Sequence, residues 1–320
     1  GEDLRLRAVQ MEHQQFHTNQ RRIPHLTRRY LDTLKGSLLG DHYLENEARL
    51  DHMGEALEKG QSVDFDDLDA PVVRLQNRLR AVETRHRDGT PHLGGRNAAW
   101  LPYATMGRTR LDHLESCLDT LQHDQVRGDF VSCGTSRGGD AIFLAGWLDS
   151  RQSDRRVWVA DELRGPLRRA GESAGDRRMA GDLDFVREGF ERFGLMGENI
   201  RFLQGRFADT LPDARVRRIA LLRIEASRPA AITTALESLY DRVEPGGIVI
   251  VDGLQSEEAL AAGEEFLTAR GTGEELSRAS WGARFWRKPD EDVTTDGDDA
   301  TTATAPQGNR SRRYLSLIHI

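Results

Sequence analysis

The sequence predicts a doubly wound α/β fold with a mostly parallel sheet, and three observations lead to this prediction. An apolar strand at residues 129–134 runs through a glycine-rich turn into an apolar helix at 140–148. A second apolar strand, at 156–161, ends in Asp161. Further strands and helices then alternate as far as residue 270. Near-continuous apolar strands separated by helices are typical of a parallel sheet that is covered on both faces.

The N-terminal part of the chain, to about residue 90, is predicted to be helical, because apolar residues recur there at the spacing of one helix face. An acidic connector at 61–71 separates two such runs, and a loop rich in Gly and Pro at 88–96 follows them. A third run predicts a helix that leads into the first strand. The three runs are Leu26, Tyr30, Leu31, Leu34, Leu38 and Leu39; Val72, Leu75, Leu79 and Val82; and Leu111, Leu114, Cys117, Leu118 and Leu121.

After the second strand, the alternation of helix and strand continues. The turn Pro245-Gly246-Gly247 is expected to lead into the fifth strand, which ends in Asp252. Residues 274–288 alternate in polarity and predict a closing pair of strands. The other expected elements are strands at 200–203, 219–224 and 248–251 and helices at 182–194, 229–243 and 256–270.

These patterns divide the chain into an N-terminal helical region at 1–95, an α/β domain at 96–288 and a tail at 289–320. The tail is predicted to be disordered, because Asp, Thr, Gly and Ala dominate it and large apolar residues are almost missing. Its last residues, 315–320, resemble a translated sequencing adaptor, and they are excluded from the predicted fold.

The composition excludes several classes of protein. The net charge of -7, from 45 basic and 52 acidic residues, argues against a dedicated nucleic-acid binder. No apolar stretch is long enough to span a membrane, and no signal peptide opens the chain. Two cysteines do not make a disulfide framework, so we expect a cytoplasmic protein.

Glycines and a strand-end carboxylate predict a nucleotide-like ligand at the carboxyl edge of the sheet. Gly134, Gly138 and Gly139 allow the backbone to pass close to a ligand, and the following helix offers free N–H groups at its N-terminus. Asp161 is placed to accept both hydroxyls of a ribose; the alternative is that it only caps the following turn. A nicotinamide dehydrogenase is disfavoured, because the pattern Gly-x-Gly-x-x-Gly is absent.

A series of short motifs carries a family resemblance. They are Tyr30-Leu-Asp-Thr-Leu-Lys35, Arg110-Leu111-Asp112, Gly128-Asp129-Phe130, Arg137-Gly138-Gly139, Val157-Trp-Val-Ala-Asp161, Val186 through Phe190, Arg201-Phe-Leu203, Phe207-Ala-Asp-Thr-Leu-Pro212, Leu222-Arg223 and Pro245-Gly-Gly247. In this order, over most of residues 25–288, the chain resembles the macrocin O-methyltransferases, the TylF-like group. The resemblance implies a class I methyltransferase fold, which is a Rossmann-like, mostly parallel, seven-stranded sheet. It also implies S-adenosylmethionine-dependent methylation of a small-molecule hydroxyl, on a sugar of a natural product.

The resemblance implies a role for each residue that contacts the cofactor. One group flanks the methionine end, one residue holds the ribose, and a third group lies near the adenine. In that order they are Gly134, Arg137, Gly138 and Gly139; Asp161; and Gly205, Arg206 and Phe207.

The family pattern also implies a magnesium site after strands four and five, where family members carry Asp-Gly-Asp and Asp-Asp. This chain has Glu225-Ala226-Ser227 and Asp252-Gly253, so one carboxylate remains at each strand end. Glu225 and Asp252 are the candidate metal ligands and catalytic residues of a weakened magnesium site. Without a metal, one of them serves as a weak base or catalysis rests on proximity alone. The remaining alternative is that both are solvated acids at strand ends.

Two more departures from the family pattern support a second hypothesis. Ser132 and Ser136 stand where the family has an acidic and an aromatic residue, and residues 163–184 contain no histidine to act as a general base. The alternative is a non-catalytic relative that acts as a binding or scaffold partner. The N-terminal helical region is expected to shape the pocket of the acceptor or a contact in a homo-oligomer.

Overall fold

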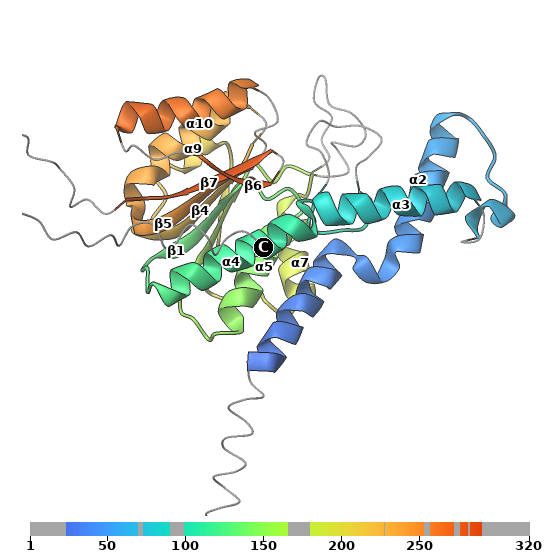
Figure 1. The fold of residues 1–320 in the computed structure, drawn as a ribbon, viewed down its shortest axis with the longest axis horizontal. Helices are drawn as coiled ribbons and strands as arrows, with labels where there is room; N and C mark the ends of the chain where they lie inside the picture. Colours follow the sequence, from blue (N-terminus) through green and yellow to red (C-terminus); the bar gives the residue numbers. More distant parts are fainter. Residues whose placement is uncertain are drawn as a thin grey trace, which may run out of the picture.

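The computed structural model describes residues 24–69, 73–89, 99–165, 180–226, 228–252, 257–271, 276–280 and 282–289. Apart from Pro289, the predicted tail lies outside the described residues. Figure 1 shows a sheet with helices on both faces and a pair of helices that projects to one side.

Within the described residues, seven strands form one sheet in the order β3-β2-β1-β4-β5-β7-β6. The first five run parallel, and the last two are antiparallel to their neighbours. The mostly parallel α/β fold predicted from the sequence is therefore confirmed. The strands are β1 (Asp129–Cys133), β2 (Val157–Asp161), β3 (Ile200–Gln204), β4 (Ile219–Glu225), β5 (Val243–Asp252), β6 (Ser277–Ser280) and β7 (Ala283–Arg287).

Helices cover both faces of this sheet (Figure 1). Alternate residues of a strand point to opposite faces, so Phe130 belongs to one hydrophobic cluster and Val131 to the other. The first cluster lies under α4 (Gly107–His123), α5 (Gly139–Asp149) and α7 (Leu183–Arg192). The second lies under α9 (Pro229–Leu239) and α10 (Glu257–Arg270). Each apolar side chain that is fully buried contributes about 1.5–3 kcal/mol.

The fifth strand begins earlier than predicted. The turn Pro245-Gly246-Gly247 was expected to precede the strand, but it lies inside β5. Gly246 donates its N–H to the Lys288 carbonyl at 2.8 Å, and Lys288 donates back to the Gly247 carbonyl at 2.8 Å. Backbone hydrogen bonds to Lys288, the residue after β7, therefore hold the glycine pair, and local turn signals do not reveal such a long-range contact.

The N-terminal helical region consists of two parts with different packing. The helix at 24–39 places Leu31, Leu34, Leu38 and Leu39 in the same cluster as α4 and α5, so it belongs to the core of the sheet layer. By contrast, α2 (Leu44–Glu58) and α3 (Val73–Asp88) share a small cluster of their own and project away from the sheet (Figure 1). Short 3-10 turns at Asp41–Tyr43 and Phe65–Leu68 complete the region. The boundary at residue 95 stays a prediction.

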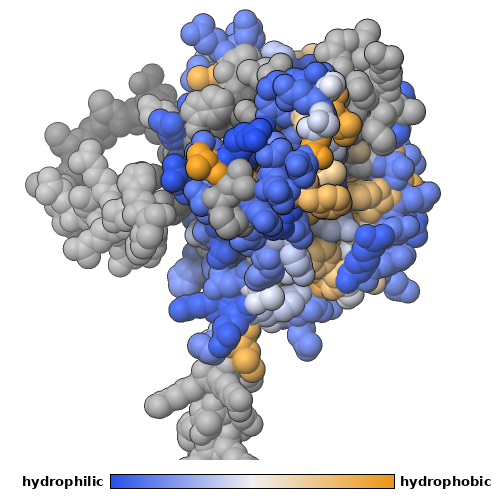
Figure 2. Space-filling view, turned by 90° about the vertical axis from the view of Figure 1, so that its right-hand side faces the viewer, coloured by the Kyte–Doolittle hydropathy of each residue, from blue (hydrophilic) through white to orange (hydrophobic). Residues whose placement is uncertain are grey.

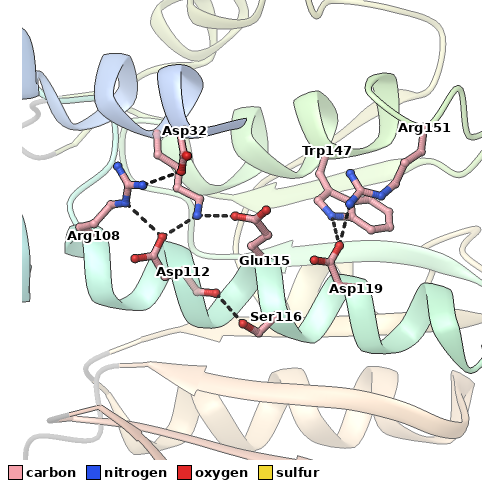
Figure 3. Close-up of polar contacts among 9 residues, drawn as sticks. Asp32, Arg108, Asp112, Glu115, Ser116, Asp119, Trp147 and Arg151 are labelled. Atoms are coloured by element: carbon pink, nitrogen blue, oxygen red, sulfur yellow. Dashed lines mark hydrogen bonds and ion pairs between the residues drawn. The ribbon is translucent and has the colours of Figure 1, made fainter. Parts of the chain in front are cut away.

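Ion pairs attach the first helix to the sheet layer, as Figure 3 shows for its contacts with α4. Lys35 is almost fully buried, and its ammonium group pairs with Asp112 and Glu115. Arg108 bonds Asp32 at 2.7 Å and Asp112 at 3.0 Å. A buried charge needs such partners, because an unpaired ammonium group out of water is costly.

The exposed surface is mostly hydrophilic in the view of Figure 2, with apolar areas between the polar residues. Among the described residues, the large apolar side chains that remain exposed belong to the N-terminal half of the chain. They are Leu26, Tyr30, Tyr43, Met53, Leu57, Phe65, Val73 and Leu101. The predicted homo-oligomer stays a prediction. Of the helices that the structure describes, none has both the length and the apolar character needed to cross a membrane.

Candidate active site

The sequence-predicted residues meet at the carboxyl ends of neighbouring strands. Gly134 donates its N–H to the carbonyl of Ala160 at 2.8 Å, and Gly205 donates to the carbonyl of Asp161 at 2.9 Å. Glu225 and Asp252 are register partners at the ends of β4 and β5. The strand order reverses at β1, between β2 and β4, and in open α/β sheets ligands bind at such a point. The edge is therefore the candidate site.

Two glycines are required by close backbone approaches at this edge. Gly134 has φ of 84°, and a Cβ there would lie 2.1 Å from the Glu225 carbonyl oxygen. A Cβ at Gly139 would lie 2.3 Å from the Ala104 amide nitrogen. No real Cβ tolerates such distances, so the turn is built for glycine. Gly138 precedes α5 as its N-cap residue.

Asp161 links the tip of β2 to the glycine turn. One carboxylate oxygen accepts the N–H of Thr135 at 2.8 Å and that of Ser136 at 3.3 Å, and the other accepts the N–H of Leu163 at 3.1 Å. The turn-capping role considered from the sequence is thus present. The ribose-binding role remains a prediction.

Burial raises the pKa of Asp161 above its ordinary value. The backbone N–H groups of Leu163, Thr135 and Ser136 lower it again, but they offset only part of the effect. Burial penalises the charged form of a carboxyl group, whereas N–H donors favour it.

Arg137 connects the glycine turn to the projecting helices. Its Nη1 donates to the Trp100 carbonyl at 2.7 Å, and its guanidinium lies over the Phe185 ring at 5.2 Å. The same Trp100 donates its backbone N–H to Glu47 of α2 at 2.5 Å. Glu47 is paired in turn with Arg85 of α3 at 2.9 Å. The sequence suggested a site role for Arg137 but not this chain of contacts, because its members are far apart in the sequence.

The residues after β3 lie at the same edge. Arg206 is the N-cap residue of the short helix α8 (Phe207–Thr210), and Phe207 packs partly buried against the second cluster. Their predicted place near an adenine remains a prediction.

A fully buried arginine lies between the carboxylates of the site. Arg223 Nη1 bonds Asp140 of α5 at 2.8 Å. Its Nη2 donates a hydrogen bond to Glu225 at 2.6 Å and forms an ion pair with Asp252 at 2.8 Å. Asp140 also accepts hydrogen bonds from the hydroxyls of Ser132 and Thr135, the second at 2.7 Å. One guanidinium thus holds three carboxylates from three different elements.

Arg223 stays positively charged in this setting. Burial alone would lower its pKa, but the carboxylates of Asp140, Asp252 and Glu225 outweigh burial and raise the pKa above its ordinary value. Arg110 of α4 adds a second cation, with Nη1 3.9 Å from Asp252 Oδ1.

Arg223 and Asp140 are not among the site residues predicted from the sequence. A signal existed: Arg223 interrupts an apolar strand, and Asp140 opens an apolar helix. A charged residue in a buried run must find a partner. Which partner it finds cannot be inferred from local spacing, since 83 positions separate the two residues.

The residues present do not fit the magnesium site that the family pattern implies. Glu225 and Asp252 converge, as predicted, but Arg223 binds both of them at the point of convergence. Magnesium needs a near-octahedral shell of oxygens at about 2.1 Å. Within the part of the chain that the structure describes, no three His, Cys, Asp or Glu side chains are grouped to hold a metal. Residues 226–227 and 253–256 supply no further carboxylate. The prediction that Glu225 and Asp252 bind magnesium is therefore not supported.

The two cysteines are buried and free. Burial raises the pKa of Cys117 to about 12, and it also raises that of Cys133. Both thiols therefore stay protonated, so neither is a candidate nucleophile.

The sheet, its glycine turn after β1 and the carboxylate at the tip of β2 define a class I methyltransferase. The model of the macrocin-O-methyltransferase (TylF) family matches residues 27–288. The chain belongs to this family. It is accordingly an S-adenosylmethionine-dependent O-methyltransferase, and the non-catalytic alternative finds no support in the comparisons.

Individual relatives agree with this membership. An 8-demethyl-8-(2,3-dimethoxy-alpha-L-rhamnosyl)-tetracenomycin-C 4'-O-methyltransferase of Streptomyces olivaceus is 37% identical over 211 residues, which cover 62% of this chain and 81% of the relative. Mycinamicin III 3''-O-methyltransferase of Micromonospora griseorubida is 31% identical over 207 residues, or 61% of this chain and 82% of the relative. The structure of the O-methyltransferase NovP is similar with a TM-score of 0.64 and 27% identity, covering 82% of this chain and all of NovP.

Proposed function

We propose that this enzyme methylates a sugar hydroxyl on a glycosylated natural product. The observation that carries the proposal is the convergence of the glycine turn, Asp161, Glu225 and Asp252 on one sheet edge, inside the region that matches the family. The names of the two relatives above support a sugar as acceptor: one acts on a rhamnosylated tetracenomycin and the other on mycinamicin III.

The donor side of the site comprises the strand ends β1, β2 and β3. S-adenosylmethionine supplies an electrophilic methyl group on a sulfonium when it is bound. In the proposal, the backbone of the glycine turn and Arg137 hold its methionine end, and the Asp161 carboxylate accepts hydrogen bonds from its ribose hydroxyls. Gly205, Arg206 and Phe207 contact the adenine.

The acceptor side comprises the ends of β4 and β5. Methyl transfer forms a bond between the acceptor oxygen and the methyl carbon, breaks the bond from that carbon to sulfur, and releases the hydroxyl proton. Glu225 or Asp252 receives the proton in the proposal. A carboxylate is a weak base towards a sugar hydroxyl, so alignment of the hydroxyl with the methyl group supplies most of the acceleration.

Calorimetric titration of the full chain with S-adenosylhomocysteine tests the donor side. We expect a single binding event that Asp161→Ala weakens by about tenfold or more. Turnover with S-adenosylmethionine and a panel of rhamnosylated and other glycosylated acceptors tests the acceptor side, with the matching aglycones as controls. Methylation of aglycones alone would overturn the assignment to a sugar, and no binding heat from folded protein would overturn the donor site.

The raised pKa of Asp161 makes cofactor binding sensitive to pH. The ionised carboxylate accepts hydrogen bonds from the ribose hydroxyls. The affinity for S-adenosylhomocysteine should therefore be highest above this pKa and should fall as the pH drops through it. The loss should begin at a higher pH than for an ordinary aspartate. The effect on folding has the opposite sign: a raised pKa favours the protonated form, so this contribution to stability is present below the unfolded value and is lost as pH rises.

Titrations from about pH 8 to about pH 4 measure this dependence. Asp161→Asn is the control, because the amide has no proton to gain in this range, and its weaker binding should not change with pH in the same way. Equal pH dependence in both proteins would contradict the assigned role of Asp161.

A further inference from the structure

At the ends of β4 and β5, the carboxylates of the site are paired with arginine side chains of the protein itself. Arg223 is fully buried, and its two Nη atoms divide between Asp140 on one side and the pair of Glu225 and Asp252 on the other. Arg110 stands 3.9 Å from the second oxygen of Asp252. Five charged groups from four elements thus form one network, with three anions and two cations.

We propose that Arg223 is the resident cation of this site, which positions Glu225 and Asp252 as anions, so that methyl transfer by this chain requires no divalent metal ion. The statement about methyl transfer rests on the proposed function. The exclusion of a metal ion from the site does not, because metal binding can be measured without turnover. Arg223 is a positioning residue, because it acts through the two carboxylates.

The geometry leaves no place for a metal ion between these two carboxylate oxygens. An ion coordinated by Glu225 Oε2 and Asp252 Oδ2 would have to lie close to Arg223 Nη2, which is 2.6 Å from the first oxygen and 2.8 Å from the second. Guanidinium cannot lose its proton in proteins, so it cannot yield its charge to make room. The rest of the network does not compensate, since Asp140 is committed to Ser132, Thr135 and Arg223.

Manganese is the probe of choice, because the paramagnetic resonance signal of free Mn2+ disappears on binding. The wild-type chain, dialysed against a chelator, should leave the signal of added Mn2+ unchanged into the millimolar range. Its turnover with the accepted sugar should change by less than about twofold between chelator and Mg2+. Stoichiometric Mn2+ binding at the site, or activity that chelator abolishes and Mg2+ restores, would overturn the proposal.

Variants at Arg223 test the cause. Arg223→Met leaves three carboxylates without their guanidinium, and it should gain Mn2+ binding together with a rise in melting temperature on addition of Mn2+. Arg223→Lys keeps a charge in place and should remain insensitive to Mn2+. A folded Arg223→Met protein that binds no Mn2+ would contradict the role of the guanidinium.

The metal-binding measurement and the turnover measurement can each be interpreted without the other. If Arg223→Met does not fold, the Mn2+ titration of the wild type decides the question alone. If no acceptor is turned over under any condition, the proposed function fails, but metal exclusion is still confirmed or overturned by the resonance signal.

Discussion

Arg223→Met is expected to lower the free energy of unfolding by about 3–5 kcal/mol, the usual cost of removing one partner from a buried ion network. The side chain is fully buried and is bonded to Asp140, Glu225 and Asp252. Methionine fills much of the volume, but it leaves these carboxylates in an environment from which water is excluded. Chemical denaturation followed by circular dichroism measures the loss, which corresponds to a fall of about 10 °C in melting temperature.

A matched substitution separates this effect from the general loss of an arginine. Arg201→Met, on the edge strand β3, removes an exposed guanidinium and should change stability by no more than about 0.5 kcal/mol. The double variant Arg223→Met with Asp140→Leu should lower the free energy of unfolding by less than the sum of the two single changes. In the double variant neither residue leaves a buried charge without the partner that it has in the wild type. Equal stability of Arg223→Met and the wild type would mean that the network is not buried as described.

Gly134→Ala is expected to abolish most cofactor binding and to destabilise the fold. A Cβ at this position meets the Glu225 carbonyl oxygen at 2.1 Å, and φ of 84° is unfavourable for any residue with a Cβ. The left-handed conformation costs about 1–2 kcal/mol, and the clash adds about 1–3 kcal/mol, since the obstacle is backbone and not a flexible side chain. The strands β1 and β4 would have to separate at the candidate site, so affinity for S-adenosylhomocysteine should fall by at least about tenfold.

Gly194→Ala is the control for the backbone term. Gly194 also has positive φ, at 69°, but nothing lies within 4 Å of the position of its Cβ. This variant should therefore lose stability through the unfavourable backbone conformation alone, and its affinity for the cofactor should not change. Normal affinity in Gly134→Ala would show that the turn is not in contact with the cofactor.

Much of the fold follows from apolar periodicity and strand ends. The strands β1 and β2 and the helix between them lie where the apolar runs of the sequence predict them. Strands of a parallel sheet are covered by helices on both faces, so their sequences are almost continuously apolar and are easy to recognise. The start of β5 was predicted incorrectly, since pairing with the last strand overrides the turn preference of Gly246 and Gly247. The attachment of the helix at 24–39 to the main core could not be derived either, because an apolar stripe does not reveal its partner.

The part of the candidate site that lies at strand ends could be predicted from the sequence. Gly134 directly follows β1, and three carboxylates are the last residues of β2, β4 and β5: Asp161, Glu225 and Asp252. Parallel strands bring their carboxyl ends to one edge of the sheet. Arg223 and Asp140 escaped notice because they lie within secondary-structure elements and become neighbours only when β4 packs against α5. The magnesium prediction is not supported for the same reason: Glu225 and Asp252 converge as predicted, but Arg223, which the sequence did not place there, lies against both.

The contacts that run from Arg85 through Glu47 and Trp100 to Arg137 have a thermodynamic consequence. Any ligand that orders the loop carrying Arg137 also favours the docked arrangement of the two protruding helices, and loosening those helices must weaken the ligand by the same factor. We therefore expect proteolysis of the exposed connector between α2 and α3 to slow when the ligand is bound.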